Sequence, residues 1–350
     1  MVEATFKSWV LSERALIAAI RRRACGTSRE LRLGIGDDCA IVRPGREEEI
    51  VVTTDFSLEG IHFRRDWHAP ESVGHRCLAR GLSDLGAMGA RPVAAFLSMA
   101  VPQELLVARR ESSWVERFLD GLLTLADRYE VPLAGGDTAR TPEHKGHGGL
   151  ACFDIVLLGT VERGQALLRS RAKVGDVIYV TGALGGAAAE LLALRRSPRR
   201  FARLTKAVAG HPHLYPEPRL AVARKLVEKG VHAAIDVSDG LSTDLDHICE
   251  ESGLAAELDA EAIPVHPLAA QAERTGWIPS ATELALHGGE DYELLFTAPR
   301  ETKVPRSIAG VGLHRIGRML SSKSRGPRMM LRDARSRLTT LEPGGWEYFR

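Results

Sequence analysis

Apolar and polar residues alternate along the chain with two periods, one typical of helices and one typical of strands. In the first half, the helical period predicts helices over residues 8–24, 70–88 and 111–129, and short apolar runs predict strands over residues 50–55, 93–101, 131–134 and 151–161. In the second half, the same criteria predict strands over residues 177–181 and 292–297, a strand within 233–241 that leads into a helix ending near Ser252, an alanine-rich helix after Gly186, a helix over residues 219–229, and a tail with a helix and a strand near Ile316.

The order of these elements indicates the fold class. Strands and helices mix without the regular β-α-β spacing that a doubly wound parallel sheet requires. We therefore expect an α+β protein of two domains, residues 1–150 and 151–350, with mixed or antiparallel sheets flanked by helices. We also expect residues 33–42 to pair with the strand that ends at Asp55, as a hairpin with a long loop.

Composition and charge narrow the class of protein. The chain has 350 residues, of which 44% are hydrophobic and 26% charged, which is enough for two cores. The net charge is only +2, and no aromatic residues interleave with the arginine pairs, so no nucleic-acid partner is expected. No apolar run approaches the roughly 20 residues of a membrane helix, so no membrane association is expected.

Cysteine usage indicates the compartment. The five cysteines include no C-x-x-C pair and their number is odd. This argues against a disulfide framework and against a thiolate zinc site. The expected compartment is therefore the cytoplasm.

Aspartates next to glycine, serine or threonine carry the candidate chemistry. Asp55 ends the run Ile50–Val52 and Thr53-Thr54, at the mouth of a predicted strand. A single aspartate of this kind is more often a helix cap or turn former than a ligand. The same arrangement recurs, however, at five further positions: Asp38 (in Asp37-Asp38), Asp84, Asp137, Asp236 and Asp239. Six such acids would repel one another without cations, and hard oxygen ligands suit Mg²⁺ ions that carry a polyphosphate.

Glycine pairs and one histidine add to this picture. Gly135-Gly136 and Gly288-Gly289 are able to present backbone N–H groups to phosphate oxygens, although plain turns use the same residues. No P-loop motif and no protein-kinase catalytic loop occurs. His62 lies in a glycine-containing loop after Asp55, where either a structural or a functional role is open.

Taken together, six motifs resemble the thiamine-monophosphate kinase family over nearly the whole chain. They are Gly34–Ala40, Thr53–Asp55 with Glu59–Phe63, Leu82–Leu85 with Ala87–Ala90, Gly135–Thr138, Asp236–Gly240, and Gly288–Leu294 with the closing Gly345-Trp346. Single motifs are shared with aminoimidazole-ribonucleotide synthetase, selenophosphate synthetase and the hydrogenase maturation factor of the same superfamily.

The resemblance implies a two-domain ATP-binding fold like that of aminoimidazole-ribonucleotide synthetase, a homodimer whose N-terminal sheets join, and transfer of the γ-phosphoryl group of ATP to thiamine monophosphate. It implies several Mg²⁺ ions bound by Asp38, Thr53, Thr54, Asp55, Asp84, Asp137, Asp236 and Asp239. It implies ATP contacts at Gly136, Asp137, Arg169 and Ser238, thiamine-phosphate contacts at His62, Glu290 and Trp346, and a catalytic role for Asp84, Asp137 and Asp239.

One departure from the family pattern is visible, and two alternatives stay open. Gly121 stands where some members place an aromatic residue near the nucleotide, so the adenine pocket is expected to be lined differently. The first alternative is a sister enzyme that uses ATP on another acceptor. The second is a non-catalytic protein that binds a metal or a nucleotide.

Overall fold

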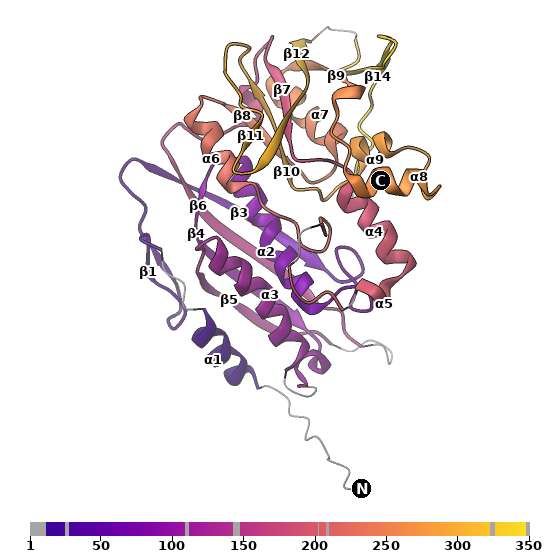
Figure 1. Ribbon diagram of the computed structural model, residues 1–350. Coiled ribbons are helices and arrows are strands. Elements are labelled where there is room, and N and C mark those ends of the chain that lie inside the picture. Colours follow the sequence, from indigo (N-terminus) through magenta and orange to yellow (C-terminus); the bar gives the residue numbers. More distant parts are fainter. Residues whose placement is uncertain are drawn as a thin grey trace.

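In the described part of the chain, a four-stranded and an eight-stranded β-sheet with helices packed against them build most of the molecule, beside a small sheet of two strands, as the computed structural model in Figure 1 shows. The structure describes residues 12–24, 28–108, 112–142, 148–201, 203–207, 210–322 and 326–347. The first half contains α1 (Glu13–Arg23), β1 (Leu31–Leu33), β2 (Ile41–Val42), β3 (Glu48–Leu58), α2 (Pro70–Ala87), β4 (Arg91–Val101), the 3₁₀ helix η1 (Gln103–Leu106), α3 (Trp114–Arg128), β5 (Leu133–Arg140) and β6 (Cys152–Glu162).

The second half begins with another 3₁₀ helix. Its elements are η2 (Arg169–Arg171), β7 (Val177–Thr181), α4 (Gly186–Arg196), α5 (Pro198–Phe201), α6 (Leu220–Glu228), β8 (Ala233–Val237), α7 (Leu241–Ser252), β9 (Leu254–Asp259), η3 (Ala260–Ala262), α8 (Pro267–Arg274), α9 (Ala281–His287), β10 (Glu293–Ala298), β11 (Ser307–Ile308), β12 (Val311–Ser321), β13 (Met329–Arg332) and β14 (Leu338–Thr340).

The first sheet has the strand order β3-β6-β4-β5. Its pairs are antiparallel except for the parallel pair β4 and β5. Helices α2 and α3 cover one face, where Phe118 and Phe153 stack with ring centroids 4.0 Å apart in the core. Burial of such a phenylalanine contributes about 1.5–3 kcal/mol, so this face accounts for much of the stability of the first half.

The opposite face of the first sheet is open along β3. Alternate residues of a strand point to opposite faces, and Ile50, Val52 and Phe56 on this side are 43%, 63% and 55% exposed. Thr54 lies in the same row, whereas Thr53 and Asp55 face α2. The sheet therefore separates the three residues of the Thr53–Asp55 motif onto two faces.

The second sheet has the order β14-β13-β9-β12-β7-β10-β8, with β11 paired to β12. It is antiparallel apart from the pair β13 and β9. Helix α2 of the first half packs against α6 and β8 of the second half. The mixed and antiparallel sheets confirm the expected α+β class, and α2 joins the two halves.

Several details of the sequence interpretation were wrong. The domain bounds 1–150 and 151–350 stay a prediction, and because β6 pairs with both β3 and β4 we propose a division that follows Glu162. The expected hairpin does not form, because β2 pairs with β1 and β3 pairs with β6. In the described part of the tail after β10, there are strands β11–β14 and no helix.

Two strands continue beyond their predicted ends. β3 runs to Leu58, so Asp55 lies inside a strand rather than at its mouth. Likewise β5 includes the whole Gly-Gly-Asp-Thr turn, so Asp137 is a strand residue. Helices α1 and α3 confirm the predicted helices, whose residues 8–11 and 111 lie outside the described residues.

Gly121 of α3 faces α2. A Cβ atom at this position would lie 1.9 Å from the carbonyl oxygen of Glu71, so the close approach of α2 and α3 requires glycine. The expectation that the adenine pocket is lined differently stays a prediction. Within the described residues, none of the helices combines the length and the apolar character that a membrane crossing would need.

Candidate active site

One face of α2 forms a wall of the site. Arg76, Arg80 and Asp84 follow one another at intervals of four residues, which places them in one row of the helix. Each side chain contacts a different partner: Arg76 binds Glu290, Arg80 binds Asp55, and Asp84 accepts a hydrogen bond from Thr53. This row of α2 therefore contacts both β3 and the loop before β10.

Four aspartates line one cavity of about 340 Å³. They are Asp55 of β3, Asp84 of α2, Asp236 of β8, and Asp239 of the loop after β8. Asp236 is buried and accepts a hydrogen bond from Ser83 Oγ at 2.7 Å, which links β8 directly to α2. The structure thus brings together four of the six predicted acids, and they come from both halves of the chain.

Burial shifts the pKa values of these acids upward, and at Asp236 and Asp55 a neighbouring carboxylate adds to the shift. Burial, and to a smaller extent the charge of Asp84, raise the pKa of Asp236 to about 7. Burial, opposed by Arg80 and reinforced by Asp84, raises the pKa of Asp55 to about 6. Burial also raises the pKa of Asp84 and of Asp239. Together these buried carboxylates form an all-oxygen donor set of the kind that Mg²⁺ prefers.

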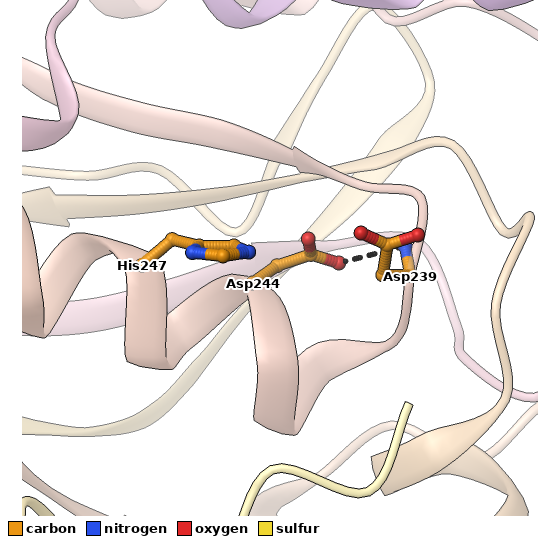
Figure 2. Close-up of side chains that lie close together, drawn as sticks. All are labelled: Asp239, Asp244 and His247. Atoms are coloured by element: carbon orange, nitrogen blue, oxygen red, sulfur yellow. Dashed lines mark hydrogen bonds between the residues drawn. The ribbon is translucent and has the colours of Figure 1, made fainter. Parts of the chain in front are cut away.

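The loop that carries Asp239 is held by Asp244 of α7. Asp244 Oδ2 accepts hydrogen bonds from the backbone N–H groups of Ser238, Asp239 and Gly240 at 3.0–3.2 Å. Figure 2 shows Asp239, Asp244 and His247 close together, with the Asp244 carboxylate directed at the backbone of Asp239. These three residues have the spacing of a possible metal site, but the backbone bonds explain the position of Asp244 without an ion.

His62, Glu290 and Trp346 line the same cavity as the four acids. Burial lowers the pKa of His62 to about 4, and the backbone N–H of Leu58 donates to its Nδ1 at 2.9 Å. The neutral ring therefore carries its proton on Nε2. The Trp346 side chain is 55% exposed, and its backbone N–H donates to the carbonyl oxygen of Asp239 at 3.0 Å, which fixes the tail beside the acid loop.

Glu290 is held by the guanidinium of Arg76 and by a pair of buried histidines. Its carboxylate binds the guanidinium of Arg76, and His213 Nδ1 lies 3.0 Å from Oε2. His68 Nε2 lies 3.1 Å from His213 Nε2, behind this pair. Burial alone would raise the pKa of Glu290, but Arg76 and His213 lower it well below its usual range. Glu290 is therefore ionised, and the positive charge of Arg76 balances its negative charge.

Asp38 and Asp137 lie apart from the four acids. Both are exposed and line a separate hollow beside α1 and β5. β3 and β5 stand at opposite edges of the four-stranded sheet, three strand spacings or about 14 Å apart. Thr54 shares their open face, where its hydroxyl donates to Asp154 at 2.7 Å. One chain alone therefore does not bring all the predicted metal ligands together.

The four predicted nucleotide contacts, Gly136, Asp137, Arg169 and Ser238, also divide between these places. Ser238 lines the cavity of the four acids. The positive charge of Arg169 in η2 opposes the rise that burial causes in the pKa values of Asp84, Asp236 and Asp239. Gly136 lies beside Asp137 in β5. A Cβ there would be 1.9 Å from the carbonyl oxygen of Leu97, and φ is +150°, so only glycine fits.

Sequence reasoning missed four side chains at the site. Arg76 and Arg80 were readable from their spacing to Asp84 on a predicted helix. Ser83 was inside a quoted motif, but its bond to Asp236 joins residues 153 positions apart. Asp154, the partner of Thr54, gave no signal because it stands in an ordinary apolar strand.

Comparison with known proteins identifies the domains. A family model for AIR synthase related protein, N-terminal domain, matches residues 36–161, and one for AIR synthase related protein, C-terminal domain, matches residues 173–326. The two matches are separated by residues 162–172, which begin with the last residue of β6 and end before β7.

Curated relatives and a solved structure similar to the chain are described as thiamine-monophosphate kinases. The chain is 36% identical over 311 residues to the thiamine-monophosphate kinase of Salmonella typhimurium, with 88% of this chain and 90% of the relative covered. The crystal structure of thiamine-monophosphate kinase from Stenotrophomonas maltophilia K279a is 36% identical, covers 93% of this chain and 98% of its own, and has a TM-score of 0.74. A structure described as "AaThiL complexed with AMPPCP and TMP" is 28% identical with 97% coverage of both chains and a TM-score of 0.72.

Proposed function

The chain belongs to the thiamine-monophosphate kinase family, and on this premise we propose how its residues carry out the reaction. The enzyme transfers the γ-phosphoryl group of ATP to thiamine monophosphate and forms thiamine diphosphate. The observation that carries the residue assignment is one cavity in which four carboxylates meet His62, Glu290 and Trp346. Since the substrates are ATP and a coenzyme precursor, we place the enzyme in the cytoplasm.

The acceptor needs no general base. The phosphate of thiamine monophosphate is anionic at neutral pH and is itself the attacking group, so the chain has to position it and reduce repulsion from ATP. His62 is neutral and the four carboxylates surround the cavity, which leaves Arg169 and Arg80 as positive groups near the reacting phosphates. The protein therefore contributes orientation and charge balance rather than covalent chemistry.

Mg²⁺ ions fit the acid cavity. Asp55, Asp84, Asp236 and Asp239 would hold them, and bound Mg²⁺ would neutralise charge on the phosphate oxygens. Thr53 donates its hydroxyl hydrogen to Asp84 and so orients that carboxylate. Of the three residues with an assigned catalytic role, Asp84 and Asp239 belong to this cavity and Asp137 does not.

Thiamine monophosphate lies between the tail and the loop before β10 in this proposal. Glu290 has φ +66° and Tyr292 has φ +50°, so this loop holds two non-glycine residues in the left-handed region. Such strain is retained where the surrounding structure fixes it, as Arg76 fixes Glu290 here. Because Arg76 balances the charge of Glu290, the carboxylate serves as an anchored hydrogen-bond acceptor, and the Trp346 indole faces the thiazolium cation.

We further propose that a second copy of the chain completes the site. Thr54 lies on the open face of the first sheet with the exposed apolar residues Ile50, Val52 and Phe56. If two such faces join, Thr54 of one chain meets Asp38 and Asp137 of the partner subunit. Gly136, next to Asp137, would then present its backbone to ATP at the shared site, together with Arg169 and Ser238.

A coupled ADP-release assay tests the function. Purified protein with ATP and Mg²⁺ is offered thiamine monophosphate, thiamine, or an aminoimidazole-ribonucleotide precursor in separate reactions. We expect ADP only with thiamine monophosphate. ADP release with the aminoimidazole precursor would favour the sister enzyme, and no release with any acceptor would favour a non-catalytic binding protein.

Mixing two inactive variants tests the shared site. Asp84→Asn and Asp137→Asn are unfolded and refolded together, so that about half of the dimers carry one chain of each kind. If the two residues act from different chains, each mixed dimer regains one intact site, and the mixture recovers roughly a quarter of wild-type activity. If the mixture stays inactive while light scattering shows mixed dimers, Asp84 and Asp137 act within one chain.

A further inference from the structure

Arg80 occupies the middle of the α2 wall. It lies four residues after Arg76, which holds Glu290, and four residues before Asp84, which belongs to the acid group. At a rise of 1.5 Å per residue, Arg80 is about 6 Å along the helix axis from either neighbour. Its side chain is 14% exposed and lines the cavity. Arg80 therefore stands between the residues assigned to thiamine and those assigned to metal ions.

The contacts of Arg80 fix where its charge lies. One guanidinium nitrogen donates to the backbone carbonyl of Phe56 at 2.7 Å, and another donates to Asp55 Oδ1 at 3.1 Å. The carbonyl bond ties the side chain to β3 through a neutral group. The bond to Asp55 is to a carboxylate whose pKa is raised and which is assigned to a cation. A cation at Asp55 would therefore compete with Arg80 for this carboxylate and turn its guanidinium toward another anion.

The acceptor phosphate is the anion that must pass this point. A molecule with its ring system at Glu290 and Trp346 and its phosphate at the acids has its phosphate beside Arg80. The four carboxylates repel that phosphate, and the charge of Arg76 is taken up by Glu290. A planar guanidinium with two parallel N–H donors matches a phosphate better than a point charge does.

From this position, we infer that Arg80 binds the phosphate of thiamine monophosphate and thereby makes the site prefer the monophosphate over thiamine. The inference rests on the proposed function and adds a residue to it. The competing explanation is structural: Arg80 ties β3 to α2 through Phe56 and Asp55, and its loss only loosens the first half.

Equilibrium binding separates these explanations without turnover. Isothermal titration calorimetry with Mg²⁺ and without ATP measures thiamine monophosphate and thiamine on wild type, Arg80→Met and Arg80→Lys. We expect Arg80→Met to weaken thiamine monophosphate roughly 10- to 100-fold, the range for a lost hydrogen bond to a charged group, and to leave thiamine unchanged. Arg80→Lys keeps the charge and loses the fork, so its affinity for the monophosphate should be intermediate.

Arg117→Met is the matched control. Like Arg80, Arg117 forms an ion pair with a carboxylate, that of Glu71 in α2 at 2.8 Å, but it does not line the cavity. A preference for the monophosphate that is equal in wild type and Arg80→Met would overturn the inference, as would equal weakening of both ligands. If Arg80→Met does not fold, the same comparison on Arg80→Lys decides. Absence of thiamine monophosphate phosphorylation by wild type would instead refute the proposed function.

Discussion

Replacing Asp84 by asparagine tests the metal site most directly. The substitution keeps the shape of the side chain, removes one negative charge, and leaves an amide oxygen that accepts the hydrogen bond from Thr53. Asp84 is also the first charged neighbour that raises the pKa of Asp236. Removing it relieves repulsion in the metal-free protein, so we expect its unfolding free energy to change by no more than about 1 kcal/mol.

The stabilisation by Mg²⁺ should change much more. At a Mg²⁺ concentration of about 100 times Kd, a bound ion stabilises the wild type by about 2.7 kcal/mol. Removing a group that only supports a metal ligand weakens metal binding about 10- to 100-fold. Removing a ligand itself should therefore weaken Mg²⁺ binding at least about 100-fold. At a hundredfold weaker affinity, the same Mg²⁺ concentration stabilises Asp84→Asn by only about 0.4 kcal/mol.

Urea unfolding with EDTA and with Mg²⁺ measures both quantities, and the coupled assay at saturating Mg²⁺ measures turnover. Asp246→Asn is a suitable control, because Asp246 pairs with Arg328 at 2.7 Å and does not line the cavity. We expect Asp84→Asn to fold, to lose most of its Mg²⁺-dependent stabilisation, and to lose turnover. Near-normal turnover, or the wild-type gain from Mg²⁺, would show that Asp84 is not a metal ligand.

Three further predictions follow from the site. Trp346→Ala should raise KM for thiamine monophosphate, with a cation–π loss of roughly 0.5–2 kcal/mol, and spare KM for ATP; a change in the ATP constant alone would contradict our placement of the acceptor. Incubation with γ-labelled ATP and no acceptor should leave no label on the denatured protein, and stoichiometric label would mean a phosphoenzyme. Burial lowers the folded pKa of His68 to about 2, so its neutral form contributes stability that is present above pH 6.5 and is lost as pH falls toward 2. His68→Gln should therefore flatten the fall of unfolding free energy between pH 6.5 and 4 by up to about 1.4 kcal/mol per pH unit, and an unchanged slope in urea melts would refute this.

The sequence was sufficient for local structure wherever the period of apolar residues was long. Helices α2 and α3 carry continuous buried faces, and their positions were predicted to within a few residues. Strand ends were not, because a strand ends where its partner ends. β3 continues through Asp55 to Leu58 because β6 offers hydrogen bonds along its whole length, and nothing in residues 48–58 reports the length of β6.

The residue types of the site were also readable from the sequence. Asp84, Asp236 and Asp239 were singled out because acids beside small residues favour metal ions, and the structure places all three around one cavity. The sequence did not indicate that Asp137 and Asp55 lie in strands at opposite edges of one sheet, about 14 Å apart, since that separation is set by the strand order β3-β6-β4-β5.

The chain by itself determined which residues are chemically able to hold cations and phosphates, because this ability belongs to each side chain. Only the tertiary structure decided which of them act together. Alternation along β3 sends Thr53 and Asp55 toward α2 and Thr54 to the open face, and the helical row of α2 brings Arg80 to the cavity. These neighbours depend on sheet pairing and helix packing between residues far apart in sequence, and no local pattern records such contacts.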